Sequence, residues 1–379
     1  MTLALKHFLA NRGAIDDGAV KRFLAEYGAP IVEGGQVAFL FHAHADAVRL
    51  RHFIFALPAS QAFERVPGTN LWHLTMDVPL RSRIEYKFEV EMDGRTFLIR
   101  DPLNTRRAHD PYGANYVLVT PGYLTPTWIE TDTEARAGEM ETLSIHSNAL
   151  DGERTVEIYL PARMRRTRSY PLMICFDGRD YLHFAAMRTI LDNLIHRDEV
   201  EPMIVAFSQS PNRMQEYAAN DEHSRFVAEE LMPTLEARYP LRPGAENRGL
   251  MGASLGAVAS LHCAWKYPGR FGQLMLQSGS FAFTDIGKQV KHPVLEPVRE
   301  FVNRFREEPS AISQRIFMSC GTYEGLIYEN RSLYPMLKRT NMDVRFVEAR
   351  DGHNWENWRD RQREALAYLF PGPLGLVYE

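Results

Sequence analysis

The sequence predicts a smaller all-β sandwich of immunoglobulin type, followed by an α/β domain with a mostly parallel sheet flanked by helices. Three observations predict this architecture. In the first third of the chain, apolar and polar residues alternate with a period of two. Further on, short and almost continuously apolar runs alternate with helical segments, as in a parallel sheet covered on both faces. A G-x-S-x-G pentapeptide at residues 252–256 lies between a strand-like run and a helical run.

The first domain is predicted to span residues 1–135. It begins with two short helices, the second at residues 18–27, and continues with strands that alternate in polarity, most clearly at residues 84–90. The pair Asp93-Gly94 is typical of a hairpin turn. Strands are predicted at residues 37–41, 47–51, 71–76 and 84–90. The stretch 120–138, which is rich in Pro, Gly, Thr and acidic residues, is the predicted linker.

The second domain is predicted to span residues 136–379 and to hold the chemistry. Helices are expected at residues 223–239 and 328–339. The strands are expected at residues 156–160, 172–176, 203–207, 249–252, 273–277, 315–319 and 344–347.

Composition limits the partners. The chain has 379 residues, 45% of them hydrophobic and 24% charged, which is typical of a soluble globular protein. A net charge of −4 favours neither nucleic acid nor an anionic membrane as a partner. The start of the chain lacks the pattern of a signal peptide, and the three cysteines, Cys175, Cys263 and Cys320, fit a reduced compartment, so we expect a cytoplasmic protein. No zinc-binding spacing is present, no cofactor is expected, and a homodimer is one open oligomeric state.

The pentapeptide predicts a nucleophile at Ser254. A tight turn from strand to helix would hold the serine in a strained conformation and project its hydroxyl into a cleft. Side chains at Gly252 and Gly256 are expected to collide with the neighbouring backbone. The start of the following helix offers the N–H of Leu255 to a developing oxyanion.

A serine nucleophile needs a base and an acid further along the chain. His353 lies in a Gly-His loop after the last predicted strand, and Glu324 lies in the loop after the strand before it. The order Ser, acid, His is that of α/β-hydrolases. Asp351 and Glu329 are the alternative acids, but Asp351 shares a short loop with His353 and Glu329 belongs to the following helix.

The remaining candidates surround this triad. Gly178 permits a turn after an early strand, so the N–H of Arg179 can serve as the second oxyanion donor. Arg213 would suit an anionic or catecholate ligand, although it equally suits an ion-paired loop. The residues predicted to bind substrate are Arg213, Glu216, Tyr217, Tyr323 and Trp355, and for Trp355 core packing is an equal alternative.

Taken together, these residues resemble the enterochelin esterase branch of the esterase D-like α/β-hydrolases. The resemblance is carried in chain order by Asp101–Asn104, Phe176–Gly178, Arg213 with Glu216, Glu229–Pro233, Gly252–Gly256, Thr322–Glu324 and Gly352–Trp355. It implies a cytoplasmic serine esterase that hydrolyses a ferric siderophore, with iron arriving as part of the substrate. The family commonly has Gly-Gly-His before the base, where this chain has Asp351.

Three other readings remain open at this point. The chain also resembles feruloyl and acetyl-xylan esterases, and a general carboxylesterase is a related alternative. Acyl transfer to an alcohol would use the same triad. A ligand- or glycan-binding protein on a hydrolase scaffold would not use it at all.

Overall fold

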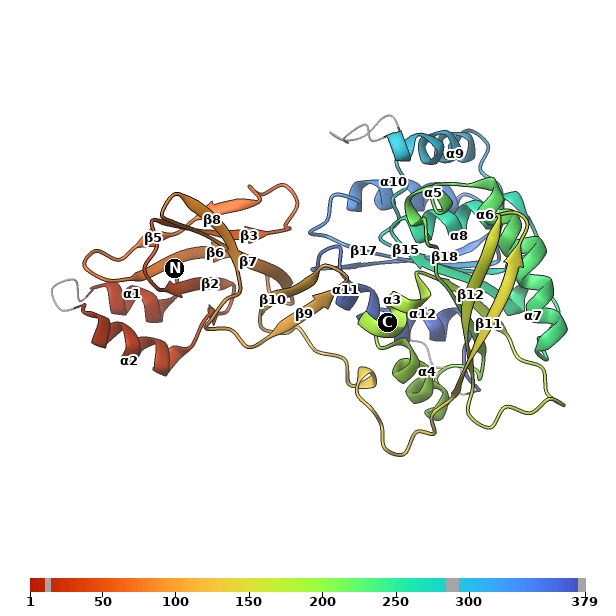
Figure 1. Cartoon of the computed structure of the whole chain (residues 1–379), viewed down its shortest axis with the longest axis horizontal. Coiled ribbons are helices and arrows are strands. Elements are labelled where there is room, and N and C mark those ends of the chain that lie inside the picture. Colours follow the sequence, from red (N-terminus) through yellow and green to blue (C-terminus); the bar gives the residue numbers. More distant parts are fainter. Residues whose placement is uncertain (11–14, 284–292, 374–379) are drawn as a thin grey trace. The chain divides into compact units, whose positions relative to one another are not determined.

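The computed structural model describes residues 1–10, 15–283 and 293–373, and Figure 1 shows its helices and strands. The described chain separates into two compact units. The first contains Met1–Thr125 together with two loops from the second half of the sequence, Gly321–Gly325 and Ala349–Asn354. The second contains the other described residues from Pro126 onward. The division at Thr125 falls inside the Pro- and Gly-rich stretch that the sequence marks as the linker.

The first unit holds two antiparallel sheets and two helices, as predicted. The helices are α1 (Leu3–Ala10) and α2 (Asp17–Tyr27). One sheet has the order β1 (Ile31–Glu33), β2 (Gln36–His42), β6 (Leu71–Asp77), β5 (Glu64–Arg65). The other has the order β4 (Ser60–Ala62), β3 (Ala47–His52), β7 (Arg83–Met92), β10 (Gly113–Val119), β9 (Arg107–Asp110), with β8 (Arg95–Ile99) paired to β7.

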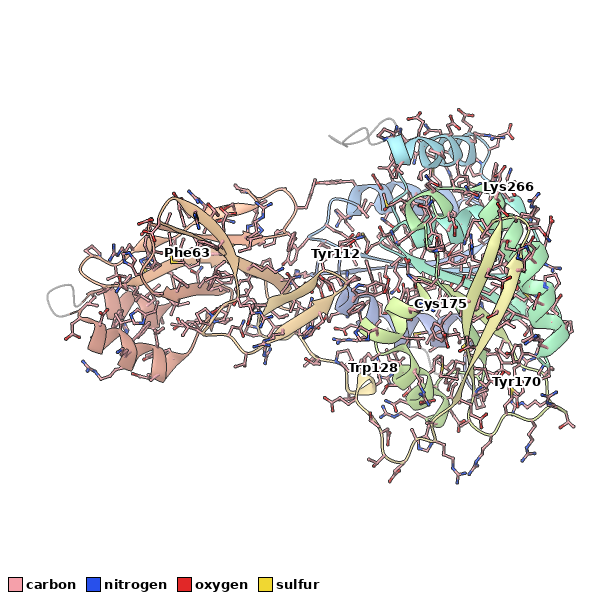
Figure 2. All side chains as sticks on the ribbon, in the orientation of Figure 1. Phe63, Tyr112, Trp128, Tyr170, Cys175 and Lys266 are labelled. Carbon is pink, nitrogen blue, oxygen red and sulfur yellow. The ribbon has the colours of Figure 1, made fainter. Side chains whose placement is uncertain are left out.

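Strand β2 shows how this unit is packed. Phe39 and Phe41 contact Tyr86 and Phe88 of β7, with ring centroids 5.0 and 5.8 Å apart, and so fill the space between the sheets. The intervening Leu40 points the other way and belongs to a second apolar cluster with α1 and α2. Because alternate side chains of a strand lie on opposite faces, the helices cover the outer face of this sheet. Phe63 in Figure 2 belongs to the core between the sheets.

The second unit is built on one eight-stranded sheet of mixed direction. Its order is β11 (Glu139–Ser147), β12 (Gly152–Leu160), β14 (Ile204–Ser208), β13 (Leu172–Phe176), β15 (Arg248–Ala253), β16 (Gln273–Gln277), β17 (Arg315–Gly321), β18 (Asp343–Ala349). Strands β13 to β17 pair in parallel, whereas β12 pairs antiparallel with β11 and β14. All seven strands predicted for this domain are present, and β11 is an eighth.

Helices cover both faces of this sheet. Met173 and Cys175 of β13 face a cluster that includes α3 (Gly178–Phe184), α4 (Met187–His196), α11 (Trp355–Asp360) and α12 (Gln362–Leu369). Ile174 and Phe176 face the opposite cluster, which includes a π-helical segment (Phe226–Leu231), α7 (Met232–Arg238), α8 (Leu255–Lys266), α9 (Glu296–Glu307) and α10 (Ile327–Lys338). On the same face, His223 of α6 (Asp221–Arg225) packs against Phe176. The other short helical turns are η1 (Thr127–Ile129), α5 (Arg213–Glu216), η3 (Ala245–Asn247) and η4 (Pro293–Leu295). Burial on both faces explains the continuously apolar strands.

Cys175, labelled in Figure 2, is a buried free thiol, as are Cys263 and Cys320. Within the described part of the chain, no helix combines the length and the apolarity needed to cross a membrane.

Candidate active site

Ser254 occupies the turn between β15 and α8. Its backbone dihedrals are φ 58° and ψ −119°, a conformation that residues other than glycine rarely adopt. A Cβ atom on Gly252 would lie 2.5 Å from the backbone carbon of Gly256, so the first glycine is required by close packing of the strand against the helix. A Cβ on Gly256 would meet only side chains, those of Asp177 at 3.4 Å and Phe176 at 3.6 Å. The expected collision with backbone therefore holds for Gly252 and not for Gly256.

This difference predicts unequal effects of alanine at the two glycines. Gly252→Ala should lower the free energy of unfolding by about 1–3 kcal/mol, because either the strand or the helix must shift to admit the methyl group. Gly256→Ala is the matched control. Its methyl group would lie 3.4 Å from a side-chain oxygen of Asp177, so this variant should cost less. Urea unfolding of both variants measures the difference. A loss in Gly256→Ala as large as that in Gly252→Ala would contradict this account of the turn.

Glu324 and His353 are brought together within the first unit. Glu324 Oε2 lies 2.5 Å from His353 Nδ1, and Glu324 Oε1 accepts a hydrogen bond of 2.7 Å from the N–H of Gly321. The carboxylate is buried, with 4% of the side chain exposed, whereas 37% of the imidazole is exposed. Because an ionised carboxylate only accepts hydrogen bonds, it places the imidazole proton on Nδ1 and leaves Nε2 as the proton acceptor.

The alternative acids have other surroundings. The Asp351 carboxylate contacts Arg83 at 3.2 Å and accepts from Asn354 Nδ2 at 2.8 Å. Burial raises the pKa of Asp351 to about 6, although the Arg83 guanidinium opposes this shift. Glu329 lies in α10, as the sequence indicates.

The predicted oxyanion donors are both at the start of a helix. The N–H of Arg179, in the first turn of α3, donates to Gln209 Oε1 over 3.1 Å. Leu255 is the first residue of α8, so its N–H has no partner within the helix. Glycine is needed at position 178 because a Cβ there would lie 2.5 Å from the backbone of Phe207. The positive φ of this turn, 55°, falls on Asp177.

Arg213 forms an ion pair with Asp177 and a hydrogen bond to Ala253, the residue before Ser254. Its Nε lies 2.8 and 2.9 Å from the two carboxylate oxygens of Asp177, and one terminal nitrogen donates to the carbonyl oxygen of Ala253 over 3.2 Å. Burial raises the pKa of Asp177 to about 6, against the attraction of Arg213. The pair therefore links the loop after β13 to the end of β15, which supports the turn at Ser254.

Two of the residues predicted to bind substrate, Glu216 and Tyr217, are engaged in contacts within the protein. Tyr217 is completely buried, and its hydroxyl oxygen accepts from the N–H of Asp177 over 3.2 Å. A side chain without exposed surface cannot touch a ligand in this conformation. Glu216 is buried in an ion pair with Arg154 at 3.0 Å.

Trp355 and Tyr323 are similarly engaged. Trp355 packs edge-on against Tyr181 and Trp358, with centroids 5.2 and 4.8 Å away, which is the packing alternative that the sequence left open. Tyr323 is half-buried, with its hydroxyl 2.5 Å from Ser82 Oγ. The side chain of Arg213, which is also predicted to bind substrate, is 32% exposed beside the turn at Ser254.

Ser280 was not among the predicted site residues, but its hydroxyl contacts that of Ser254. Ser280 Oγ lies 3.1 Å from Ser254 Oγ, and the N–H of Ser280 donates to the carbonyl of Ser254 over 3.2 Å. The buried Asn330 side chain holds the turn before it, since its Nδ2 donates to the carbonyl of Gly279 over 2.9 Å and its Oδ1 accepts from the N–H of Gly279 over 3.3 Å. The signal in the sequence is the Ser-Gly-Ser run at residues 278–280. It follows β16, which pairs with β15, the strand before Ser254.

Removing this hydroxyl tests whether the contact matters for turnover. Ser280→Ala should lower kcat/KM for a p-nitrophenyl ester by roughly three- to tenfold, the size expected for one neutral hydrogen bond. The control is Ser260→Ala, because Ser260 is a buried serine of α8 whose hydroxyl bonds to the carbonyl of Gly256 instead. Equal rates for the two variants would mean that the contact has no part in turnover.

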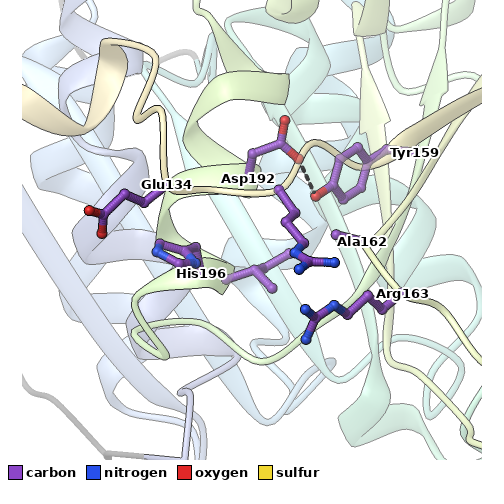
Figure 3. Close-up of a pocket in the computed structure, with 8 residues that line it drawn as sticks. Glu134, Tyr159, Ala162, Arg163, Asp192 and His196 are labelled. Carbon is purple, nitrogen blue, oxygen red and sulfur yellow. Dashed lines mark hydrogen bonds between the residues drawn. The ribbon is translucent and has the colours of Figure 1, made fainter.

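A separate pocket lies near the amino-terminal ends of the parallel strands, whereas Ser254 follows the carboxyl end of β15. It has a volume of about 250 Å³ and includes Tyr159, Asp192 and His196 in its lining. Figure 3 shows the hydrogen bond of 2.8 Å from the hydroxyl of Tyr159 to Asp192. Because β12 runs antiparallel to β14, the end of β12 at Tyr159 lies beside the start of the parallel strands. Ser254 lies at the opposite ends of these strands. This pocket is therefore not part of the site at Ser254.

A mostly parallel sheet with helices on both faces and a strained serine between strand and helix defines an α/β-hydrolase. Residues 147–369 match the model of the Esterase family, and the chain belongs to that family.

Named relatives are similar over most of the chain. It is 24% identical over 338 residues to the iron(III) enterobactin esterase of Escherichia coli K12, covering 82% of each chain. It is 27% identical over 247 residues to the protein YjcH of Bacillus subtilis, covering 60% of this chain and 96% of YjcH.

Solved structures share the fold. The ferric enterobactin esterase of Salmonella typhimurium superposes with a TM-score of 0.75 at 22% identity, covering 92% of this chain and 98% of the other. A ferulic acid esterase superposes with a TM-score of 0.55 at 16% identity, covering 62% of this chain and 98% of the other. The shared fold thus extends over nearly all of this chain in one case and over 62% of it in the other.

Proposed function

We propose that this esterase hydrolyses carboxylic esters through Ser254 as nucleophile, His353 as base and Glu324 as the acid that orients the imidazole. The observation that carries the proposal is the hydrogen bond of 2.5 Å between Glu324 and His353 in a chain that also has a strained serine at a nucleophile turn. In chain order, the three residues follow β15, β17 and β18 of one sheet. This is the order Ser, acid, His of α/β-hydrolases.

The proposed reaction has two stages. Ser254 Oγ attacks the ester carbonyl carbon while His353 Nε2 takes the hydroxyl proton, and the N–H groups of Arg179 and Leu255 stabilise the oxyanion. The C–O bond to the leaving alcohol then breaks, and His353 returns the proton to that oxygen. Water, activated by the same imidazole, attacks the acyl-enzyme and releases the acid and free Ser254.

The Arg179 donor requires a rearrangement in this scheme. Its N–H already donates to Gln209 Oε1, so an oxyanion must displace that amide oxygen. The exchange replaces a neutral acceptor with a charged one, and hydrogen bonds to charged acceptors are roughly twice as strong. The Gln209 amide therefore satisfies the donor until substrate arrives.

We further propose a siderophore-type ester inside the cell as the substrate. Relatives named for iron(III) enterobactin cover the chain across both of its units, whereas the likeness to a ferulic acid esterase spans 62% of it. The guanidinium of Arg213, partly exposed beside the nucleophile turn, suits the negative charge of catecholate groups. Three buried free thiols agree with a cytoplasmic location.

A substrate panel tests this assignment. We expect kcat/KM for ferric enterobactin to exceed that for methyl ferulate and p-nitrophenyl acetate by at least about tenfold, the effect of one polar contact that the smaller esters lack. Initial rates of the full-length enzyme, with Ser254→Ala as the blank, give the comparison. Faster turnover of methyl ferulate would replace the siderophore with an aromatic ester and leave the proposed triad unchanged.

A further inference from the structure

Arg83, the first residue of β7, carries a buried guanidinium whose contacts converge on the loop that holds His353. One terminal nitrogen lies 3.2 Å from Asp351 Oδ1 and 3.1 Å from Asn354 Oδ1. The other donates to Glu85 Oε1 over 2.9 Å. The exposed fractions of the Arg83, Asp351 and Glu85 side chains are 3%, 5% and 8%. All five residues, His353 included, belong to the first unit.

Asp351 fixes both neighbours of His353 in the sequence. Its Oδ1 accepts from the N–H of Gly352 over 2.7 Å and from Asn354 Nδ2 over 2.8 Å, in addition to Arg83. A displacement of this carboxylate would therefore move the loop on each side of the imidazole.

The loop that carries Glu324 is hydrogen-bonded both to the loop of His353 and to the N-terminal part of the first unit. The N–H of Tyr323 donates to the carbonyl of Asp351 over 3.0 Å, and the N–H of Phe55 donates to the carbonyl of Tyr323 over 2.7 Å. The N–H of Arg83 itself donates to the carbonyl of Arg350 over 2.9 Å. Strand β7 and the loop at Phe55 therefore hold both loops from the N-terminal part of the unit.

We infer that Arg83 is a positioning residue for catalysis, and that the N-terminal β unit serves to hold the loops of the acid and the base in register. This inference rests on the proposed roles of Glu324 and His353. A buried ion pair is often no more stabilising than an apolar packing of similar volume, so stability alone is a weak explanation for three buried charges here. Fixing a catalytic group to within a fraction of an ångström is a stronger one, because small misplacements cost much of the rate.

Kinetics of full-length variants test the inference. Arg83→Met should lower kcat for a p-nitrophenyl ester by roughly 10- to 100-fold and leave KM within about threefold, because it misplaces the base without removing a substrate contact. Asp351→Asn, which keeps the size of the side chain, should lower kcat in the same way. The double variant Arg83→Met/Asp351→Asn should lose little more than either single one, since the two residues act through one contact.

Arg331→Met is the matched control. Arg331 also forms a two-point ion pair with a carboxylate, Glu348, at 2.7 and 2.6 Å, but it is about half exposed and lies outside the first unit. Its loss should leave kcat unchanged. Conversely, Arg83→Lys should recover part of the rate lost in Arg83→Met, because an ammonium can replace part of the contacts of the guanidinium.

The variants distinguish a failure of the positioning role from a failure of the proposed function. Wild-type kcat in folded Asp351→Asn and Arg83→Met, with Ser254→Ala inactive, would overturn the positioning role and keep the esterase mechanism. Persistent turnover in Ser254→Ala would overturn the mechanism itself. Should Arg83→Met fail to fold, the isosteric Asp351→Asn decides the question, and wild-type kcat there would also overturn the positioning role.

Discussion

Replacing Ser254 with alanine is expected to lower kcat for ester hydrolysis by about 10⁵- to 10⁶-fold, the range seen when the nucleophile of a serine triad is removed. The loss is large because the covalent route disappears, while oxyanion donors and substrate binding retain only a small residual rate. The side chain that remains is smaller, so the strained turn with φ 58° should persist and the fold with it.

The measurement is kcat on a p-nitrophenyl ester, with Ser260→Ala as the control for a lost serine hydroxyl nearby. Unfolding curves should coincide for Ser254→Ala and the wild type to within about 1 kcal/mol. A residual rate above about one hundredth of the wild type would mean that another group performs the attack.

Replacing Glu324 with glutamine is expected to lower kcat by about 10⁴-fold, the effect of presenting an amide to the base of a serine triad. The amide keeps the shape of the side chain, but its N–H₂ favours the tautomer with the proton on His353 Nε2. That nitrogen can then no longer accept the proton of Ser254. The buried carboxylate, 4% exposed, also no longer stabilises the imidazolium that forms.

Comparison with Asp351→Asn makes this test specific. The same change of carboxylate to amide at Asp351 should cost at most about 100-fold, because Asp351 acts on His353 only through its loop. Rates with one p-nitrophenyl ester at saturating concentration give the ranking. A larger loss in Asp351→Asn than in Glu324→Gln would transfer the role of the acid to Asp351.

The strands of the second unit could be predicted because burial leaves a direct record in the sequence. Strand β13 is apolar at all five positions, since Met173 and Cys175 face one layer of helices and Ile174 and Phe176 the other. Strand β11 was missed for the opposite reason. It is an edge strand in which exposed Glu139, Glu141 and His146 resemble the polar linker before it.

Local chemistry also decides how much of the site could be predicted. Gly252 is dictated by the close approach of the backbone at Gly256, so a short motif is enough to find the turn. The contacts of Ser280 and Arg83 depend instead on which strands and loops meet in the folded chain. A local run such as Ser278-Gly279-Ser280 marks a turn but does not show which residue the turn will meet. Tyr217 lies close to Arg213, a predicted ligand-binding residue, but its hydroxyl contacts the N–H of Asp177 in the interior. Only the fold shows this direction of the side chain.

The central claim is that Ser254 forms the acyl-enzyme. The most direct test is to react the full-length enzyme with diethyl p-nitrophenyl phosphate and to find the modified residue by mass spectrometry of its peptides. The account predicts one diethylphosphoryl group per chain, on Ser254, with loss of esterase activity in the same proportion. Labelling of a different residue, or full inactivation without modification of Ser254, would contradict it.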